Sequence, residues 1–394
     1  LNHRHGGSVV PRRPKVEAEA ATAGDGGRGA PPRFDLRPSL PAVDGFPRTA
    51  WLAALSRVMR TVPDRRLGYP HPLGEPELRA ALAGWLARRR GVRAGAEQVV
   101  VTGGLRPGLP LAWSLLAGRG VCRVAVEHPG WRRVPASLRI AGLEPVPVRV
   151  DDAGIDPAAL GAAVQAVVVT PAHHFPTGAV LPPDRRARLV TWARDHGAFI
   201  LEDDYDAEYR YDRQPLGSLH GLAPDRVIHG GSASKSLAPA LRLGWLVLPS
   251  SLLGDLDPDH APLPGSPPPI DQLAFADLLE RGEVDRHLRR QRARYRRRRE
   301  ALLEAVAARL PEAEIRGAAA GLFAVLVLPE GTDEDAVVAA AAARGVALEA
   351  VGDPRGPALA VGYANLPEAA APAAVATLAE VVGATVRAPT PHLT

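Results

Sequence analysis

The feature that most constrains the fold is an alternation, from about residue 97 onward, between short apolar β-branched runs and longer amphipathic stretches. Stretches such as "RRARLVTWARDHG" (185–197) have the length and pattern of a helix, and they separate the apolar runs. The runs lie at residues 98–102, 122–126, 166–170, 198–201, 226–228 and 243–248. Strands that alternate with helices indicate an α/β fold, with a large, mostly parallel sheet that carries helices on both faces. Ligands of such sheets bind at the carboxyl ends of the strands.

The length of the chain, 394 residues, predicts two domains. A proline-rich segment (255–269) follows the last apolar run, and a strand and helix pattern beyond it (321–383) suits a smaller α+β domain. Residues 1–32 are rich in Gly, Ala, Pro and charge, which is typical of a disordered tail or linker. We expect a tail (1–32), a segment that joins the two domains (33–65), a large domain (66–254) and a small C-terminal domain that includes a long basic helix (255–394).

Membrane and secreted proteins are disfavoured by the composition. No apolar run reaches the roughly 20 residues of a membrane span, and no basic region followed by an apolar stretch marks a signal peptide. Cys122 is the only cysteine, which excludes an internal disulfide and a cysteine-based metal cluster. A reducing cytoplasm is the simplest location for such a chain.

The formal net charge is +5, and much of the basic excess lies in "RHLRRQRARYRRRRE" (286–300). Such a run can bind nucleic acid. The alternative is a long solvated helix, because Leu288, Tyr295 and Leu302 recur at about helical spacing. We favour the helix, since the run has no aromatic platforms and no recognition motif.

Lysine is nearly absent from the chain, and its only occurrence after Lys15 is Lys235, in "HGGSASKSLAPALRLGW" (229–245). The other basic side chains, out of 48, are all arginine. A primary amine can condense with an aldehyde, whereas a guanidinium cannot. Lys235 is therefore a candidate for amine chemistry, and a surface lysine retained by chance is the alternative.

An acidic segment, "LEDDYDAEYRYD" (201–212), places a pair of carboxylates at the end of an apolar strand. A buried aspartate there is costly unless it meets a cation or hydrogen-bond donors. The protonated ring nitrogen of pyridoxal phosphate is such a cation, and Tyr205 could donate to the phenolic oxygen of the same ring. On its own, the segment could equally bind a metal or be solvated.

Three further segments follow predicted strands. "VVTGGLRPGLPLAW" (100–113) has a diglycine before a helix start, where backbone N–H groups can hold phosphate. "EHPGWRR" (127–133) includes Trp131, whose indole could stack on a flat ring or pack in the core. "TPAHHFPTG" (170–178) contains adjacent histidines, which rarely converge on one metal ion. We expect polar groups of a cofactor pocket there, and no metal site.

In this order the motifs resemble the fold type I pyridoxal-phosphate enzymes of the aminotransferase class I/II family. More narrowly, "EDDYDAEYRYDRQPLGSL", "SKSLAPALRLGW" and "GYANLPE" are similar to the aminotransferase-like domain of the MocR/GabR-type bacterial transcriptional regulators, which belong to the GntR superfamily. The similarity runs from residue 33 to residue 368. Those regulators also carry an N-terminal winged helix-turn-helix, which nothing in residues 1–32 can form.

The resemblance implies a role for each motif residue. Lys235 would form the Schiff base with pyridoxal 5'-phosphate, while Asp203 would pair with the ring nitrogen and Tyr205 with the phenolic oxygen. Arg133 and His173 would contact the substrate, Arg133 through a ligand carboxylate. The other cofactor-binding residues would be Gly104, Leu105, Trp131, Phe175, Ser232, Ser234 and Arg242, with Tyr69 reaching the phosphate of the partner subunit in a homodimer.

The chain departs from the family pattern at several positions. Gly103 and Arg106 stand where the phosphate turn usually has serine and glutamine, and "HHFPTG" replaces "HQFPTG". Amino-acid transaminases carry an arginine near the C-terminus that clamps the substrate carboxylate, whereas "RGPALAVGYANL" (355–366) has apolar residues at positions 359–361. A missing clamp weakens the case for efficient turnover of ordinary amino acids.

Two functions are therefore expected. The first is the effector domain of a MocR-type regulator, which senses a small amino compound or the cofactor itself and contacts DNA only through a winged helix-turn-helix that this chain does not contain. The alternative is a stand-alone aminotransferase that moves an amino group from an amino acid or amine to a keto acid, with Lys235 as proton carrier. Direct DNA binding by the arginine-rich helix is the least favoured.

Overall fold

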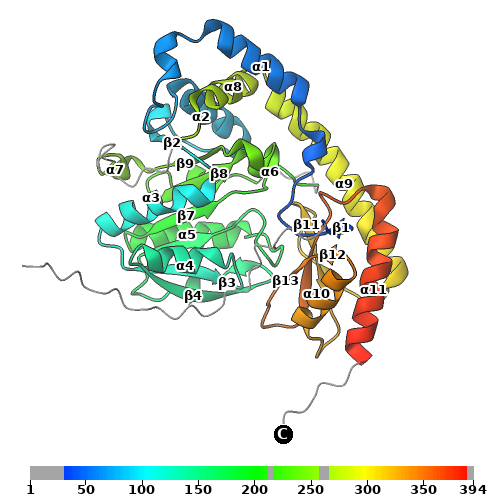
Figure 1. Cartoon of the computed structure of the whole chain (residues 1–394). Helices are drawn as coiled ribbons and strands as arrows, with labels where there is room; N and C mark the ends of the chain where they lie inside the picture. Colours follow the sequence, from blue (N-terminus) through cyan, green and yellow to red (C-terminus); the bar gives the residue numbers. More distant parts are fainter. Residues whose placement is uncertain (1–30, 212–215, 257–265, 388–394) are drawn as a thin grey trace, which may run out of the picture.

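The computed structural model describes residues 31–211, 216–256 and 266–387 (Figure 1). Nearly all of the expected tail (1–32) and much of the proline-rich segment (255–269) therefore lie outside the described residues. A large sheet with its helices and a smaller α/β layer lie side by side, and a very long helix runs along the smaller layer (Figure 1).

The large sheet has eight strands in the order β2-β9-β8-β7-β6-β3-β4-β5. These strands are β2 (Val99–Thr102), β3 (Arg123–His128), β4 (Glu144–Asp151), β5 (Gly154–Ile155), β6 (Ala166–Val169), β7 (Phe199–Asp203), β8 (Val227–Ser232) and β9 (Gly244–Val247). The five strands from β8 to β4 in this order are parallel, whereas β9 runs antiparallel to both β8 and β2. The α/β class expected from the sequence is confirmed.

Both faces of this sheet are covered by helices. On one face Val124 and Val126 of β3 pack in a core with α3 (Leu105–Gly118) and α4 (Arg133–Ile140). On the other face the intervening Ala125 packs in a core that includes α5 (Pro183–Asp195). Because successive side chains of a strand point to opposite faces, burial on both faces requires an uninterrupted apolar run.

Strand β4 was not among the strands predicted from the sequence. Its sequence, "EPVPVRVD", contains Pro145 and Pro147, which have no N–H to donate and are rare in central strands. The strand pairs with β3 from Glu144 to Arg149, and with β5 only at Val150 and Asp151. The prolines therefore lie where the other side of β4 has no described strand partner, and the ladder tolerates them.

The smaller sheet is antiparallel, in the order β10-β11-β14-β13. Its strands are β10 (Ile315–Arg316), β11 (Phe323–Val327), β13 (Glu349–Ala350) and β14 (Ala358–Gly362). Beside it lie α10 (Glu334–Ala343) and α11 (Ala371–Arg387). A short parallel pair, β1 (Phe34–Asp35) with β12 (Val346–Ala347), attaches the N-terminal segment to this part of the molecule. The remaining helices are α1 (Arg48–Thr61), α2 (Pro76–Arg90), α6 (Ala233–Ser236), α7 (Ser250–Leu253), α8 (Pro269–Glu280) and α9 (Glu283–Arg309).

The basic run at 286–300 lies within α9, which has 27 residues. Leu288 and Tyr295 are buried on its inner face. Several of its arginines bind acidic groups of the same chain, since Arg294 pairs with Asp44 and Arg297 pairs with Glu368. Among the described residues, no helix is both long and apolar enough to cross a membrane.

Candidate functional site

The motif residues gather at the carboxyl ends of the large-sheet strands. Strands β3, β6, β7 and β8 are parallel, and β2 shares their direction because β9 is antiparallel to both β2 and β8. All five strands therefore end at one edge. The segments that follow them carry the candidate residues: Gly104 after β2, Trp131 after β3, His173 after β6, Asp203 and Tyr205 at the end of β7, and Lys235 after β8.

Asp203, the last residue of β7, has a buried carboxylate without a partner. The residue is 9% exposed, and its Oδ1 makes no hydrogen bond in the described part of the chain. Burial raises the pKa of Asp203 to about 8, and the charges of Asp204 and Asp206 add to the effect. A buried polar atom without a partner is costly, so this position calls for a cationic or hydrogen-bond-donating group from a ligand.

The neighbouring carboxylates of the same segment are paired within the protein. Asp204 receives two hydrogen bonds from buried Arg90, at 2.6 and 2.9 Å. Glu202 accepts a hydrogen bond from the hydroxyl of Ser218 and lies 3.2 Å from Nδ1 of His229. In the described ranges, no group of three or more acidic, histidine or cysteine side chains is arranged to hold a metal ion. The acidic segment is therefore a buried network in which the Asp203 carboxylate binds no described residue. Asp206 contacts His173 through Oδ2, while its Oδ1 also lacks a described partner.

Lys235 lies in α6, immediately after β8, and its Nζ donates a hydrogen bond to the backbone carbonyl of Ser39. Burial lowers the pKa of the Lys235 amine, while Asp206, Asp203 and Glu349 act in the opposite direction. A lowered pKa increases the neutral fraction of the amine, which is the nucleophilic form. Nothing in the sequence indicated that Ser39, from the N-terminal segment, would reach this lysine.

Tyr205 and His173 form a second polar group beside the aspartate. The hydroxyl of Tyr205 donates to the backbone carbonyl of His173 at 2.9 Å, and burial raises the pKa of Tyr205 well above its ordinary value. Nδ1 of His173 lies 2.9 Å from Oδ2 of Asp206. Asp206 was not singled out from the sequence, although it follows in the same acidic segment. It fixes the ring of His173 within the cluster.

Hydrogen-bond donors gather between the end of β2 and the start of α3. Gly104 has φ +116° and caps the helix, and a Cβ there would lie 3.5 Å from the guanidinium of Arg242. Arg242 itself has φ +50°, the only positive value of a non-glycine residue among those described. Neither the Arg242 side chain nor the half-buried hydroxyls of Ser232 and Ser234 bond to a described residue. The N–H groups of a helix start, together with an exposed arginine that binds no described residue, form a site for an anion.

The other residues predicted for the site lie further from the cluster formed by Asp203, Tyr205 and Lys235. Trp131 is half-buried against the core under α3 and α4. Phe175 packs edge-on against Phe323 of the smaller sheet, with ring centroids 5.8 Å apart. Arg133 begins α4 and is exposed, and Tyr69 is fully exposed at 101%. Within this single chain, the structure does not bring Tyr69 into the cluster.

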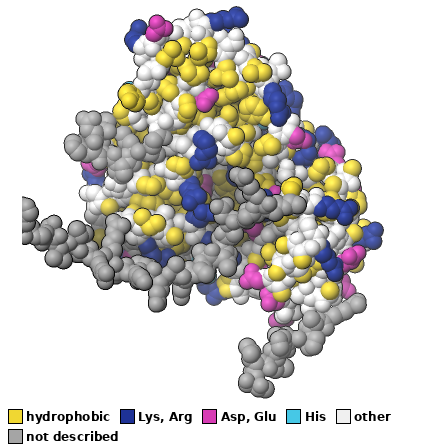
Figure 2. All heavy atoms as spheres, in the orientation of Figure 1, with side chains coloured by type: hydrophobic (Ala, Val, Ile, Leu, Met, Phe, Trp, Pro, Cys, Tyr) yellow, Lys and Arg dark blue, Asp and Glu magenta, His cyan; other side chains and the backbone are white. Residues whose placement is uncertain are grey.

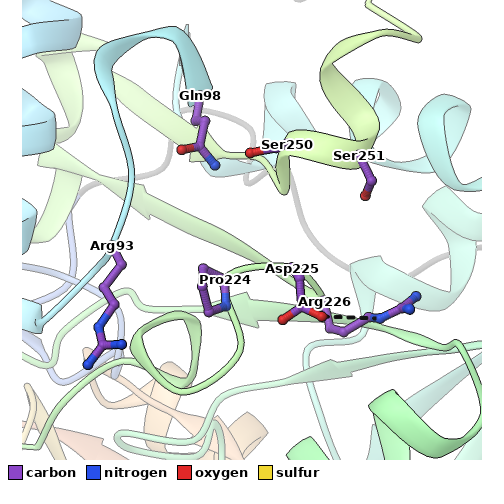
Figure 3. A pocket seen from close by; sticks show the side chains of 7 residues that line it. All are labelled: Arg93, Gln98, Pro224, Asp225, Arg226, Ser250 and Ser251. Carbon is purple, nitrogen blue, oxygen red and sulfur yellow. Dashed lines mark ion pairs between the residues drawn. The ribbon is translucent and has the colours of Figure 1, made fainter.

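A cavity of about 380 Å³ lies apart from these residues, at the opposite edge of the sheet (Figure 3). Gln98 and Arg226 in its wall immediately precede β2 and β8, so the cavity lies at the amino ends of the strands. Its lining residues are Arg93, Gln98, Pro224, Asp225, Arg226, Ser250 and Ser251. The side chains of Asp225 and Arg226 pair with each other at 3.6 Å, as Figure 3 shows. The candidate residues, including the unpartnered Asp203, lie at the opposite edge, at the carboxyl ends of the strands.

Comparison with known proteins identifies the family. The family model for aminotransferase class I and II matches residues 42–378. The HTH-type pyridoxine biosynthesis transcriptional regulator PdxR of Corynebacterium glutamicum is 35% identical over 324 residues, which are 82% of this chain and 69% of that protein. The probable rhizopine catabolism regulatory protein MocR of Rhizobium meliloti is 34% identical over 68% of this chain and 55% of its own length.

A solved structure of similar fold is LysN, the α-aminoadipate aminotransferase of Thermus thermophilus, complexed with N-(5'-phosphopyridoxyl)-L-leucine. Its TM-score is 0.78 and its identity 25%, over 90% of this chain and 92% of that chain.

Pyridoxal 5'-phosphate fits the residues described above. Its ring nitrogen can supply the cation that the unpartnered Oδ1 of Asp203 lacks. Its phosphate suits Arg242, which lies beside Gly104 and binds no described residue, and its aldehyde suits the primary amine of Lys235. The chain belongs to the aminotransferase class I and II family, whose cofactor is pyridoxal 5'-phosphate, and is similar both to true aminotransferases and to the aminotransferase-like domain of MocR-type regulators.

Proposed function

We propose that this chain is the cofactor-binding, ligand-sensing domain of a MocR-type transcriptional regulator, and that it recognises a small amino compound. The observation that carries the proposal is the apolar character of β14. Leu359, Ala360 and Val361 are all buried in the core, so this strand offers no arginine to a ligand. The nearest arginine in sequence, Arg355, is bound to Asp353 and Asp152, each at 2.5 Å. A site without a fork-like carboxylate clamp is poorly suited to turn over ordinary amino acids.

The residues of the cluster would hold the cofactor as follows. When bound, pyridoxal phosphate supplies an aldehyde for primary amines and an electron-withdrawing ring. Lys235 would provide the attaching amine, Asp203 would hold the proton on the ring nitrogen, and Tyr205 would donate to the phenolic oxygen. The phosphate would be held by the backbone of Gly104 and Leu105 with Ser232, Ser234 and Arg242, and Trp131 and Phe175 would lie beside the ring.

The ligand would enter on the side of His173. Asp206 fixes the His173 ring through Nδ1, which leaves the other ring nitrogen for a polar ligand atom. The closed network around Asp204 and Arg90 would keep the end of β7 rigid, so that Asp203 stays aligned with the ring of the bound cofactor.

We also propose that the chain forms a homodimer through the segment from residue 43 to residue 69. Five of the seven large hydrophobic side chains that are exposed in the described residues lie in this segment: Val43, Leu52, Met59, Leu67 and Tyr69. Figure 2 shows hydrophobic side chains gathered at the top of the view, where α1 lies in Figure 1. A contiguous exposed apolar surface of this kind is typical of a protein interface. In the dimer, Tyr69 would reach the phosphate site of the partner subunit.

Analytical ultracentrifugation tests the dimer. Leu52→Glu, at a position 65% exposed, should convert the protein largely to monomer because it buries an unpaired charge in the interface. Ile140→Glu, 88% exposed on α4, is the matched control and should remain dimeric. A dimer that Leu52→Glu leaves intact would place the interface elsewhere.

An aminotransferase is the second candidate, because the groups that its chemistry requires are all present. The lowered pKa of Lys235 suits an amine that exchanges protons with a substrate carbon. Single-turnover absorption spectra separate the two functions. A sensor should change its cofactor band with an amine ligand and return to the starting band when the ligand is removed. Accumulation of pyridoxamine phosphate, reversed by a keto acid, would establish the enzyme instead.

A further inference from the structure

Glu349, the first residue of β13, has a half-buried carboxylate that no described residue binds. It makes no hydrogen bond and no ion pair within the described ranges, unlike most of the other carboxylates near the cluster. In the small sheet it is paired in register with Ala360 of β14, and that position has no side chain beyond Cβ to fill the adjoining space. Figure 1 shows β13 on the side of the small sheet that is next to the large sheet.

Backbone contacts bring Glu349 close to Lys235. The Lys235 amine donates to the carbonyl of Ser39, and the same N-terminal segment pairs with β12 through the bond from Leu36 N–H to the Ala347 carbonyl, 2.7 Å, two residues before Glu349. Three carboxylates act on the Lys235 amine, namely Asp206, Asp203 and Glu349, and no arginine of the described residues is among the groups that do. Asp206 is engaged by His173, and Asp203 is the group expected to hold the cofactor ring. Glu349 is therefore the carboxylate that remains open to a ligand beside Lys235.

The cations near Glu349 leave it unpaired. Arg37, Arg132 and Lys235 act on its carboxylate, together with the negative charge of Asp35. Arg37 already forms two hydrogen bonds with Asp35, at 2.8 and 2.6 Å. Arg132 is exposed and forms no ion pair with Glu349, although its guanidinium lies 3.7 Å from where a Cβ of Gly352 would be. Burial, the largest effect, raises the pKa of Glu349, as expected for a carboxylate without a bound donor.

From this arrangement we infer that Glu349 selects a ligand with a second cationic group, so that the ligand class is a diamine or a related dication rather than an amino acid. The inference rests on the proposed function, since the first amine of the ligand would enter beside Lys235. A charge-assisted hydrogen bond to Glu349 would anchor the far end of the ligand. The same carboxylate would repel a ligand that ends in a carboxylate, which gives selectivity through repulsion as well as attraction.

Three ligands with the same four-carbon chain test the inference: 1,4-diaminobutane, n-butylamine and 4-aminobutanoate. Their far ends are cationic, neutral and anionic. Affinities are measured by isothermal titration calorimetry on protein loaded with pyridoxal phosphate, after its absorption band has been recorded. We expect 1,4-diaminobutane to bind at least about tenfold more tightly than n-butylamine, and 4-aminobutanoate to bind most weakly.

Substitutions assign that preference to one side chain. Glu349→Gln should lower the affinity for 1,4-diaminobutane about tenfold or more and leave n-butylamine nearly unchanged. Glu349→Lys should reverse the order and favour 4-aminobutanoate. Glu330→Gln, at an exposed position of the same part of the chain, is the control and should change nothing.

Equal binding of the diamine and n-butylamine, or a preference for 4-aminobutanoate in the unsubstituted protein, would overturn the inference alone. So would a Glu349→Gln protein that keeps the full preference. A protein that forms no cofactor band would overturn the proposed function, and the inference with it.

Discussion

The two faces of the acidic segment at the end of β7 differ in one respect, the presence of internal partners. On one face, Glu202 is fully buried and Asp204 is 7% exposed, and the two are bound by Ser218, His229 and Arg90. On the other face, Asp203 is almost as deeply buried, yet one of its oxygens has no partner in the described part of the chain.

This difference separates structural charges from functional ones. A buried charge that the protein pairs internally holds elements together, and its removal leaves the partner uncompensated. A buried charge that the protein leaves open raises the energy of the ligand-free state and is retained where a ligand supplies the missing group. Lys235 and Glu349, both partly buried, meet the same criterion, since no described side chain binds them, whereas Arg242 is exposed.

The largest effect is expected from Lys235→Ala, which removes one of the groups that no described side chain binds. Without the primary amine the cofactor cannot be attached covalently, so the absorption band of the attached form should be lost completely. Lys235→Arg keeps the positive charge but cannot condense with an aldehyde, and it should lose the band as well. A band that persists in either variant would show that another group holds the aldehyde.

On the closed side, Arg90→Ala should destabilise the protein by about 3–5 kcal/mol, because Asp204 would remain buried without its partner. Urea unfolding of the cofactor-free protein measures this change. Arg88→Ala, at an exposed position two residues earlier on α2, serves as the control and should cost less than about 0.5 kcal/mol. If the two variants were equally stable, the pairing around Asp204 would not be structural.

Substitution of Asp203 should increase the free energy of unfolding, whereas substitution of Arg90 lowers it. Its folded pKa is about 8 and its unfolded pKa is about 4, so between these values the folded state keeps a proton that the unfolded state has lost. The free energy of unfolding therefore falls as pH rises through this window, and then stays level. Asp203→Asn removes that dependence and should become more stable than the unsubstituted protein by a few kcal/mol at the upper end. The measurement is urea unfolding of both cofactor-free proteins from pH 5 to about pH 9, and parallel curves would contradict the prediction.

The smallest effect is expected from Ser218→Ala. Glu202 would lose one donor but would keep the backbone N–H groups of Leu219 and His220, so the loss should be about 1 kcal/mol. A thermal unfolding curve of the cofactor-free protein detects it. A loss as large as that of Arg90→Ala would mean that the network acts as one unit.

The sequence predicted the strands of the large sheet wherever a strand is buried on both faces. Strands β2, β3, β6, β7, β8 and β9 coincide with apolar runs, because such runs have few other uses in a chain of this length. Strand β4 was missed, since its prolines signal a break and only its position beside β3 makes them acceptable.

The site residues could be predicted from the sequence where they lie in short motifs. Lys235 and the acidic segment are visible as exceptions to local composition. The contacts of Lys235 with Ser39 and of Asp204 with Arg90 join residues more than 100 positions apart, and no local pattern encodes them. Glu349 has an unremarkable sequence context, and only the approach of the small sheet to the large sheet reveals it.

The most direct test of the open site is the absorption spectrum of the purified protein with pyridoxal phosphate, recorded before and after addition of an amine and then of a keto acid. We predict a band that depends on Lys235, that changes with the amine, and that recovers when the amine is removed, with no pyridoxamine phosphate formed. A protein that forms no such band, or one that converts the cofactor to pyridoxamine phosphate at a steady rate, would contradict the proposed sensor.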